Sequence, residues 1–191
     1  MSKIIGIDLG TTFSAIAQLD DLGNPEVLAS TDSNKKITAS AVYIKNSNVV
    51  VGDKALDALI ATPNNVITET KRQMENDSVY SVEAGKWIDK DENNKENFSP
   101  SQISSFILSK LKNYTSDVKK AVITVPALFA EKARVATLDA AKMAGIEVIS
   151  LINEPTAAAC YYASLPNVKK ISGKILVFDL GGGTFDVTVC E

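Results

Sequence analysis

The chain has 191 residues, of which 45% are hydrophobic and 23% are charged, and its formal net charge is −3. This length supports one substantial core with a small attached subdomain, and the composition is ordinary for a globular protein. The weak negative charge provides no field for nucleic acid or anionic membrane, and no apolar run approaches the ~20 residues of a membrane span. The N-terminus leads directly into a strand pattern without a signal peptide, so we expect a cytoplasmic protein.

The residue types present exclude several kinds of catalytic and metal site. The sequence contains no histidine, which removes Ser–His and Cys–His nucleophile systems and the usual zinc sites. The two cysteines, Cys160 and Cys190, are too few for a metal site or a disulfide framework. We expect them to be free, buried thiols in a reducing compartment.

The first part of the chain predicts strands followed by a hairpin and a helix. The expected segments are residues 3–8, 13–19 and 25–29 for three strands, 41–51 for the hairpin and 52–62 for the helix. Residues 76–98 are polar and rich in turn-forming residues, and residues 89–96 within them are typical of a solvated surface loop.

The second part of the chain predicts helices that alternate with strands. Ser99, Pro100 and Gln102 indicate a helix start, with a capping serine, a proline in the first turn and a glutamine three residues after the cap. The elements expected after this helix are a strand at 121–125, a helix at 130–144, a strand at 147–152, a helix at 155–164 and a hairpin from 174. This order predicts an α/β fold with a mixed five-stranded sheet and helices on both faces.

The organisation of the chain follows from these elements. We expect residues 1–37 and 99–170 to form one core, residues 38–98 a small inserted α+β subdomain, and residues 171–191 the opening hairpin of a second lobe. The last strand pattern runs to the final residue without a turn or a cap, so we expect this chain to be a fragment.

An acidic glycine turn occurs twice in the sequence. Residues 5–12 read Ile-Gly-Ile-Asp-Leu-Gly-Thr-Thr, and residues 177–184 read Val-Phe-Asp-Leu-Gly-Gly-Gly-Thr. Glycine allows a turn so sharp that successive N–H groups converge into an anion-binding nest. A carboxylate beside such a nest repels a bare phosphate, but hydrated Mg²⁺ between them removes the conflict. The two hairpins are therefore predicted to face each other around the phosphates of a nucleotide.

Five segments together resemble the seventy-kilodalton heat-shock chaperones of the DnaK type and, more loosely, all actin-like ATPases. They are IIGIDLGTT at 4–12, Lys71-Arg72, AVITVP at 121–126, INEPTAAA at 152–159 and DLGGGTFD at 179–186. They follow the family's order, and the likeness covers the whole chain. The resemblance implies a ribonuclease-H-like, actin-like ATPase first lobe, with a second lobe and a peptide-binding domain further along.

The resemblance also implies roles for individual residues. The expected catalytic residues are Lys71, Glu154, Asp179 and Thr184. The expected nucleotide-binding residues are Asp8, Gly10, Thr11, Thr12, Phe13, Gly181, Gly182, Gly183 and Thr184. Asp8, Asp179 and Glu154 are expected to hold Mg²⁺ through water, and Lys71 to orient the attacking water. Pro126 and Arg134 are expected to relay the nucleotide state to the peptide-binding domain.

Simpler interpretations exist for some of these residues. Without the resemblance, Lys71 would be interpreted as a surface lysine. Glu154 would be interpreted as a carboxylate at a helix start and Asp8 as a turn-forming aspartate. However, three consecutive glycines cost roughly 0.5–1 kcal/mol each relative to alanine. A close ligand explains this cost better than a loose loop does.

The implied function is ATP hydrolysis that switches the capture and release of unfolded client peptides during protein folding and stress. ATP or ADP and Mg²⁺ are the implied ligands, and a J-domain cochaperone and a nucleotide-exchange factor are the implied partners. An actin-type filament ATPase and a sugar kinase of the same superfamily remain alternatives. The sequence lacks a Gly-x-x-x-x-Gly-Lys-Ser/Thr loop and a Gly-x-Gly-x-x-Gly turn. Residues 1–191 by themselves are expected to bind nucleotide weakly and to hydrolyse little, because they hold part of the cleft.

Overall fold

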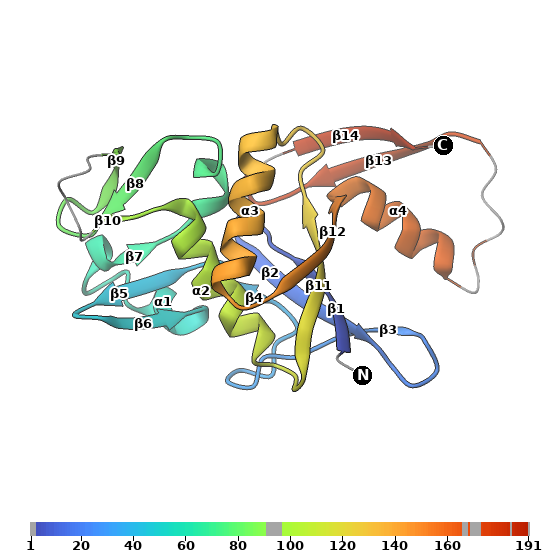
Figure 1. Cartoon of the computed structure of the whole chain (residues 1–191), viewed down its shortest axis with the longest axis horizontal. Helices are drawn as coiled ribbons and strands as arrows, with labels where there is room; N and C mark the ends of the chain where they lie inside the picture. Colours follow the sequence, from blue (N-terminus) through green and yellow to red (C-terminus); the bar gives the residue numbers. More distant parts are fainter. Residues whose placement is uncertain (1–2, 91–96, 166–167, 169–172, 184, 191) are drawn as a thin grey trace.

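The computed structural model describes residues 3–90, 97–165, 168, 173–183 and 185–190 (Figure 1). Its main sheet has the strand order β12-β11-β1-β2-β3. The bounds are β1 (Lys3–Asp8), β2 (Phe13–Leu19), β3 (Pro25–Val27), β11 (Val118–Val125) and β12 (Glu147–Asn153). A short sixth strand, β4 (Thr38–Ala39), also pairs with β2. The predicted five-stranded mixed sheet is therefore confirmed, with one short strand added.

The strand directions bring three strand ends to one edge of the sheet. β1 runs parallel to β11, and β11 runs parallel to β12, whereas β1 and β2 are antiparallel. The register places Asp8 beside Thr124 and Val125 beside Asn153. Because ligands of open α/β sheets bind outside the carboxyl ends of the strands, this edge is the expected place for a site.

One face of the sheet is buried under two helices, α2 (Pro100–Lys112) and α3 (Glu131–Met143) (Figure 1). Alternate residues of the strands point into this core, so Ile5, Ile7 and Ile16 are each about 1% exposed. The helices contribute mainly Ile103, Ile107, Leu108 and Leu111 from α2 and Ala133, Ala140 and Ala141 from α3. α2 begins with the predicted capping box between Ser99 and Gln102.

The opposite face of the sheet is open and lies toward α4 (Glu154–Ser164) and the hairpin of β13 (Ile175–Leu180) and β14 (Phe185–Cys190) (Figure 1). Helices therefore lie on both sides of the sheet, as predicted. Cys160 of α4 is exposed and Cys190 of β14 is only partly buried, which corrects the expectation of buried thiols; α4 presents much of its surface to solvent. Within the described residues, no helix is both long enough and apolar enough to cross a membrane.

Residues 38–98 contain two further small sheets. One has the order β6-β5-β7 and the other the order β10-β8-β9. Their strands are β5 (Val42–Lys45), β6 (Asn48–Val51), β7 (Val66–Ile67), β8 (Ser78–Ser81), β9 (Lys86–Asp89) and β10 (Asn97–Phe98). The helical pieces are α1 (Asp53–Asp57) and the 3₁₀ turns η1 (Pro63–Asn65) and η2 (Thr70–Gln73). The proposed domain boundaries themselves stay a prediction.

One sequence expectation in this segment was wrong, and three strands were not predicted. The helix expected over 52–62 ends at Asp57, because only Ala55 in it is buried and Ile60 is 95% exposed, so packing does not support further turns. The polar segment 76–98, for which the sequence predicted no strand, contains β8, β9 and β10, which are stabilised where Tyr80 packs edge-on against Trp87 at 5.4 Å. Of the surface loop expected over 89–96, residues 91–96 lie outside the described residues.

Candidate functional site

The first acidic turn joins β1 to β2 and is very tight. A Cβ atom placed on Gly10 would lie 2.0 Å from the carbonyl oxygen of Phe13, so this position admits only glycine without a shift of the backbone. Thr124 Oγ1 donates a hydrogen bond of 2.9 Å to Asp8 Oδ1, since a carboxylate only accepts. The Asp8 carboxylate is therefore held at the carboxyl end of β1 by the adjoining strand.

The second acidic turn joins β13 to β14 and touches the first. A Cβ atom on Gly182 would lie 1.9 Å from Thr12 Oγ1, and one on Gly183 would lie 2.9 Å from Thr11 Cγ2. Two turns from opposite ends of the chain are thus in direct contact, and glycine permits that approach. Thr184, the last residue of the second motif, lies outside the described residues.

A cavity of about 1000 Å³ lies between the open sheet face, α4 and the β13–β14 hairpin. Most of the residues expected at a nucleotide lie on its wall. They are Asp8, Gly10, Thr11, Thr12, Phe13, Lys71, Glu154, Asp179, Gly181 and Gly182. Gly183 reaches the same place through its contact with Thr11. The apolar part of the wall includes Ala157, Ala158 and Tyr161 of α4.

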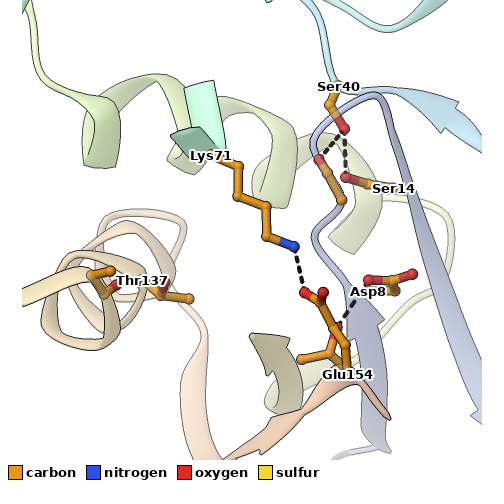
Figure 2. A network of polar contacts seen from close by, with 9 residues as sticks. Asp8, Ser14, Ser40, Lys71, Thr137 and Glu154 are labelled. Atoms are coloured by element: carbon orange, nitrogen blue, oxygen red, sulfur yellow. Dashed lines mark hydrogen bonds and ion pairs between the residues drawn. The ribbon is translucent and has the colours of Figure 1, made fainter. Parts of the chain in front are cut away.

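Lys71 and Glu154 form an ion pair beside the cavity (Figure 2). Lys71 comes from η2 and Glu154 is the first residue of α4, so the pair joins distant segments. The two side chains are only 10% and 14% exposed. The reading of Lys71 as an ordinary surface lysine is therefore wrong, and Glu154 does more than occupy a helix start.

The charges around Glu154 define the electrostatics of the site. Burial raises the pKa of the Glu154 carboxyl above its ordinary value, and the negative charges of Asp8 and Asp179 raise this pKa further. The Lys71 ammonium opposes these effects and lowers the same pKa. Two carboxylates, from β1 and from β13, therefore act on the Glu154 carboxyl of α4.

The donor set at this cavity fits a hydrated divalent cation. Among the described residues, no three acidic or cysteine side chains gather closely enough to ligate a metal directly. Mg²⁺ usually keeps several of its waters and contacts one or two carboxylates together with substrate phosphates. Positive charge between Asp8, Asp179 and Glu154 would offset the repulsion that raises the Glu154 pKa.

The two expected relay residues are connected to each other and reach the neighbour of Glu154. The N–H of Phe129 donates to the Pro126 carbonyl at 3.1 Å, and Arg134 Nε donates to the Phe129 carbonyl at 3.1 Å. Arg134 Nη2 also donates to Asn153 Oδ1 at 2.9 Å. Asn153 directly precedes Glu154, so these bonds run from the end of β11 to the cavity wall.

Several contacts that support the site were not predicted from the sequence. Thr124 donates a hydrogen bond to Asp8, and Asn153 accepts one from Arg134. Thr124 and Asn153 both lie inside motifs that the sequence analysis recognised. Arg72 Nη2 donates to the Gly183 carbonyl at 3.0 Å and so links η2 to the second turn. Ser40 binds the first turn and has no local sequence signal, because its role depends entirely on strand pairing.

Comparison with protein families identifies one model that covers this whole arrangement. The model described as Hsp70 protein matches residues 4–191. The matched range includes both acidic turns, Lys71 and Glu154. The resemblance derived from the five motifs is thereby confirmed.

Proposed function

This chain belongs to the Hsp70 protein family, and from that premise we propose that it binds ATP with Mg²⁺ between its two acidic turns and hydrolyses it. The fold is an α/β actin-like ATPase lobe, and the family is one of ATP-hydrolysing chaperones. The observation that carries the proposal is the contact of Thr12 with Gly182 on the wall of the cavity that holds Lys71 and Glu154. In the intact protein, hydrolysis would switch the DnaK-type capture and release of client peptides.

Binding of the triphosphate is proposed to depend on both turns. The N–H groups of Thr11 and Thr12 and of the glycines 181–183 would donate to phosphate oxygens, as nests of backbone donors do. Bound Mg²⁺ would supply positive charge against the phosphate oxygens and bring ordered water. Asp8 and Asp179 would accept hydrogen bonds from that water, and Asp8 is already oriented by Thr124.

Hydrolysis is proposed to use the Lys71–Glu154 pair. Phosphoryl transfer to water needs positioning and electrostatic stabilisation more than covalent chemistry. The Glu154 carboxylate would accept a hydrogen bond from the attacking water, and the Lys71 ammonium would orient this water and stabilise charge that develops on the γ-phosphate. Asp179 and Thr184 complete the proposed catalytic set from the second turn.

A signal from this site is proposed to leave through the Arg134 connection. Arg134 binds Asn153 next to Glu154 and reaches Pro126 through Phe129, so a shift at Glu154 has a hydrogen-bonded route to the end of β11. The proposed partners are client peptides, a J-domain cochaperone and a nucleotide-exchange factor. The proposed setting is the cytoplasm, under stress and during protein folding.

The experiment that tests the proposal separates chemistry from binding. In the intact protein, Lys71→Ala should lower single-turnover ATP hydrolysis by about 10²–10³-fold, the scale of losing one preorganised electrostatic group. Nucleotide affinity measured by calorimetry should change only a few-fold. Lys120→Ala is the matched control, because it removes another paired lysine whose side chain is 41% exposed. Unchanged turnover in Lys71→Ala would contradict the catalytic role.

The behaviour of residues 1–191 alone is a separate proposal. We expect weak nucleotide binding, because Asp8 and much of the second hairpin, including Phe178 and Leu180, are exposed. Micromolar or tighter ATP binding by this chain in titration calorimetry would show that the expectation is wrong.

A further inference from the structure

We propose that Ser40 is a positioning residue for the first acidic turn and that Ser14 acts through it, an inference that rests on the proposed function. Figure 2 shows the hydroxyl of Ser40 directed at the turn and at Ser14. Ser40 Oγ donates to the Gly10 carbonyl at 2.7 Å, and the Ser40 N–H donates to the Thr12 carbonyl at 2.8 Å. One residue therefore holds two carbonyl groups of the turn.

The direction of the hydrogen bonds between the two serines follows from counting protons. A hydroxyl has one proton to donate, and a carbonyl oxygen accepts only. Because Ser40 gives its proton to Gly10, the 2.8 Å bond between the hydroxyls must be donated by Ser14. Ser14 thus donates to Ser40, and Ser40 donates to the Gly10 carbonyl. Ser14 is 0% and Ser40 is 4% exposed, so bulk water does not compete for these groups.

Holding these carbonyls determines where the amide donors of the turn point. In a planar trans peptide, the C=O of one residue and the N–H of the next point in opposite directions. Gly10 C=O shares its peptide with Thr11 N–H, and Thr12 C=O shares its peptide with Phe13 N–H. Since Ser40 binds both carbonyls, it directs the N–H groups of Thr11 and Phe13 away from itself. Thr11, Thr12 and Phe13 all line the cavity.

The position of Ser40 is itself held by strand pairing. β4 precedes Ser40, and its two residues pair with Phe13 and Ser14 at the start of β2. Ser40 belongs to the segment 38–98, outside the motifs that carry the nucleotide signature. The geometry therefore makes the orientation of the phosphate-binding turn depend on this segment.

The test compares ligands with and without phosphates in the intact protein. Ser40→Ala should weaken ADP and ATP binding about tenfold, the effect of losing one buried hydrogen bond and leaving its partner unpaired. Adenosine binding should stay within about twofold, because the turn contacts the phosphates. Ser105→Ala is the matched control. It removes another buried serine that donates to a carbonyl at 2.7 Å, that of Gln102 in α2, and it should leave all three affinities unchanged.

A second variant tests whether Ser14 acts through Ser40. Ser14→Ala should weaken ADP binding about threefold, and the double variant should bind no more weakly than Ser40→Ala, because residues in one network are not additive. If Ser40→Ala fails to fold, the Ser14→Ala comparison of ADP with adenosine still decides the question.

The contradicting outcomes are distinct. Equal loss of ADP and adenosine affinity would show a general structural role for Ser40, and unchanged ADP affinity would show no role. Additive effects of the two substitutions would refute the order of the bonds. If the unmutated protein does not bind ATP, both the proposed function and this inference are wrong. If the unmutated protein binds ATP and the Ser40→Ala variant binds ATP and ADP just as well, this inference alone is wrong.

Discussion

Replacement of Gly10 by alanine is the sharpest test of the first acidic turn. The new Cβ atom would lie 2.0 Å from the carbonyl oxygen of Phe13 and 3.2 Å from its carbonyl carbon. Both atoms belong to the backbone, so no side-chain rotation relieves the contact. Real Cβ atoms essentially never come within 3.0 Å of such an atom. The Phe13 carbonyl, or the turn as a whole, must therefore move by about 1 Å.

The size of the expected effect follows from that displacement. A misplacement of ~1 Å at a site that positions reacting groups can cost about 10²-fold in rate. The overpacked turn should also lose about 1–3 kcal/mol of stability. We therefore expect Gly10→Ala to lower ATP turnover by about 10²-fold and to weaken ADP binding.

The assay needs a control with the same chemical change. Gly6→Ala adds a methyl group to β1 four residues earlier, on the wall of the same cavity, but there a Cβ atom meets no heavy atom within 4 Å. Turnover and thermal unfolding of both variants should be measured together at saturating ATP. If Gly10→Ala turns over ATP as fast as Gly6→Ala, the turn does not position the phosphates and the reasoning fails.

Three further predictions concern the second turn, the buried carboxylate and the first long helix. Gly182→Ala should weaken ATP binding, because its Cβ atom would lie 1.9 Å from Thr12 Oγ1, and the added change Thr12→Gly should restore part of the affinity in calorimetry. The folded-state pKa of Glu154 is raised, so the folded protein keeps this proton to a higher pH than the unfolded chain does. The stability of the unmutated protein relative to Glu154→Gln should therefore fall as pH rises from the ordinary glutamate pKa through this raised pKa, and parallel denaturation curves would contradict the shift. Ser99→Ala breaks the capping box with Gln102 and should cost about 1 kcal/mol in chemical denaturation, without any change in ATP turnover.

The sequence predicted the elements whose signals are local. Apolar strand patterns next to glycine turns predicted β1, β2 and the β13–β14 hairpin. The capping residues Ser99 and Gln102 predicted the start of α2. The strands β8 to β10 were missed because they are short and set among polar residues. Their stability comes from contacts such as Tyr80 with Trp87, which no local pattern shows. The short α1 was overestimated for the same reason, since burial decides how far such a helix continues.

The sequence alone predicted the role of the two acidic turns. The chemistry of a glycine turn with an adjacent carboxylate depends only on residues that are neighbours in the chain. Which groups meet across the cavity was decided by the tertiary structure. Lys71 pairs with Glu154 because η2 and α4 both reach the cavity at the end of the central strands. Ser40 binds Gly10 because β4 pairs with β2 in one particular register. These contacts join segments far apart in the chain, and only the packing of sheets and helices places such segments together.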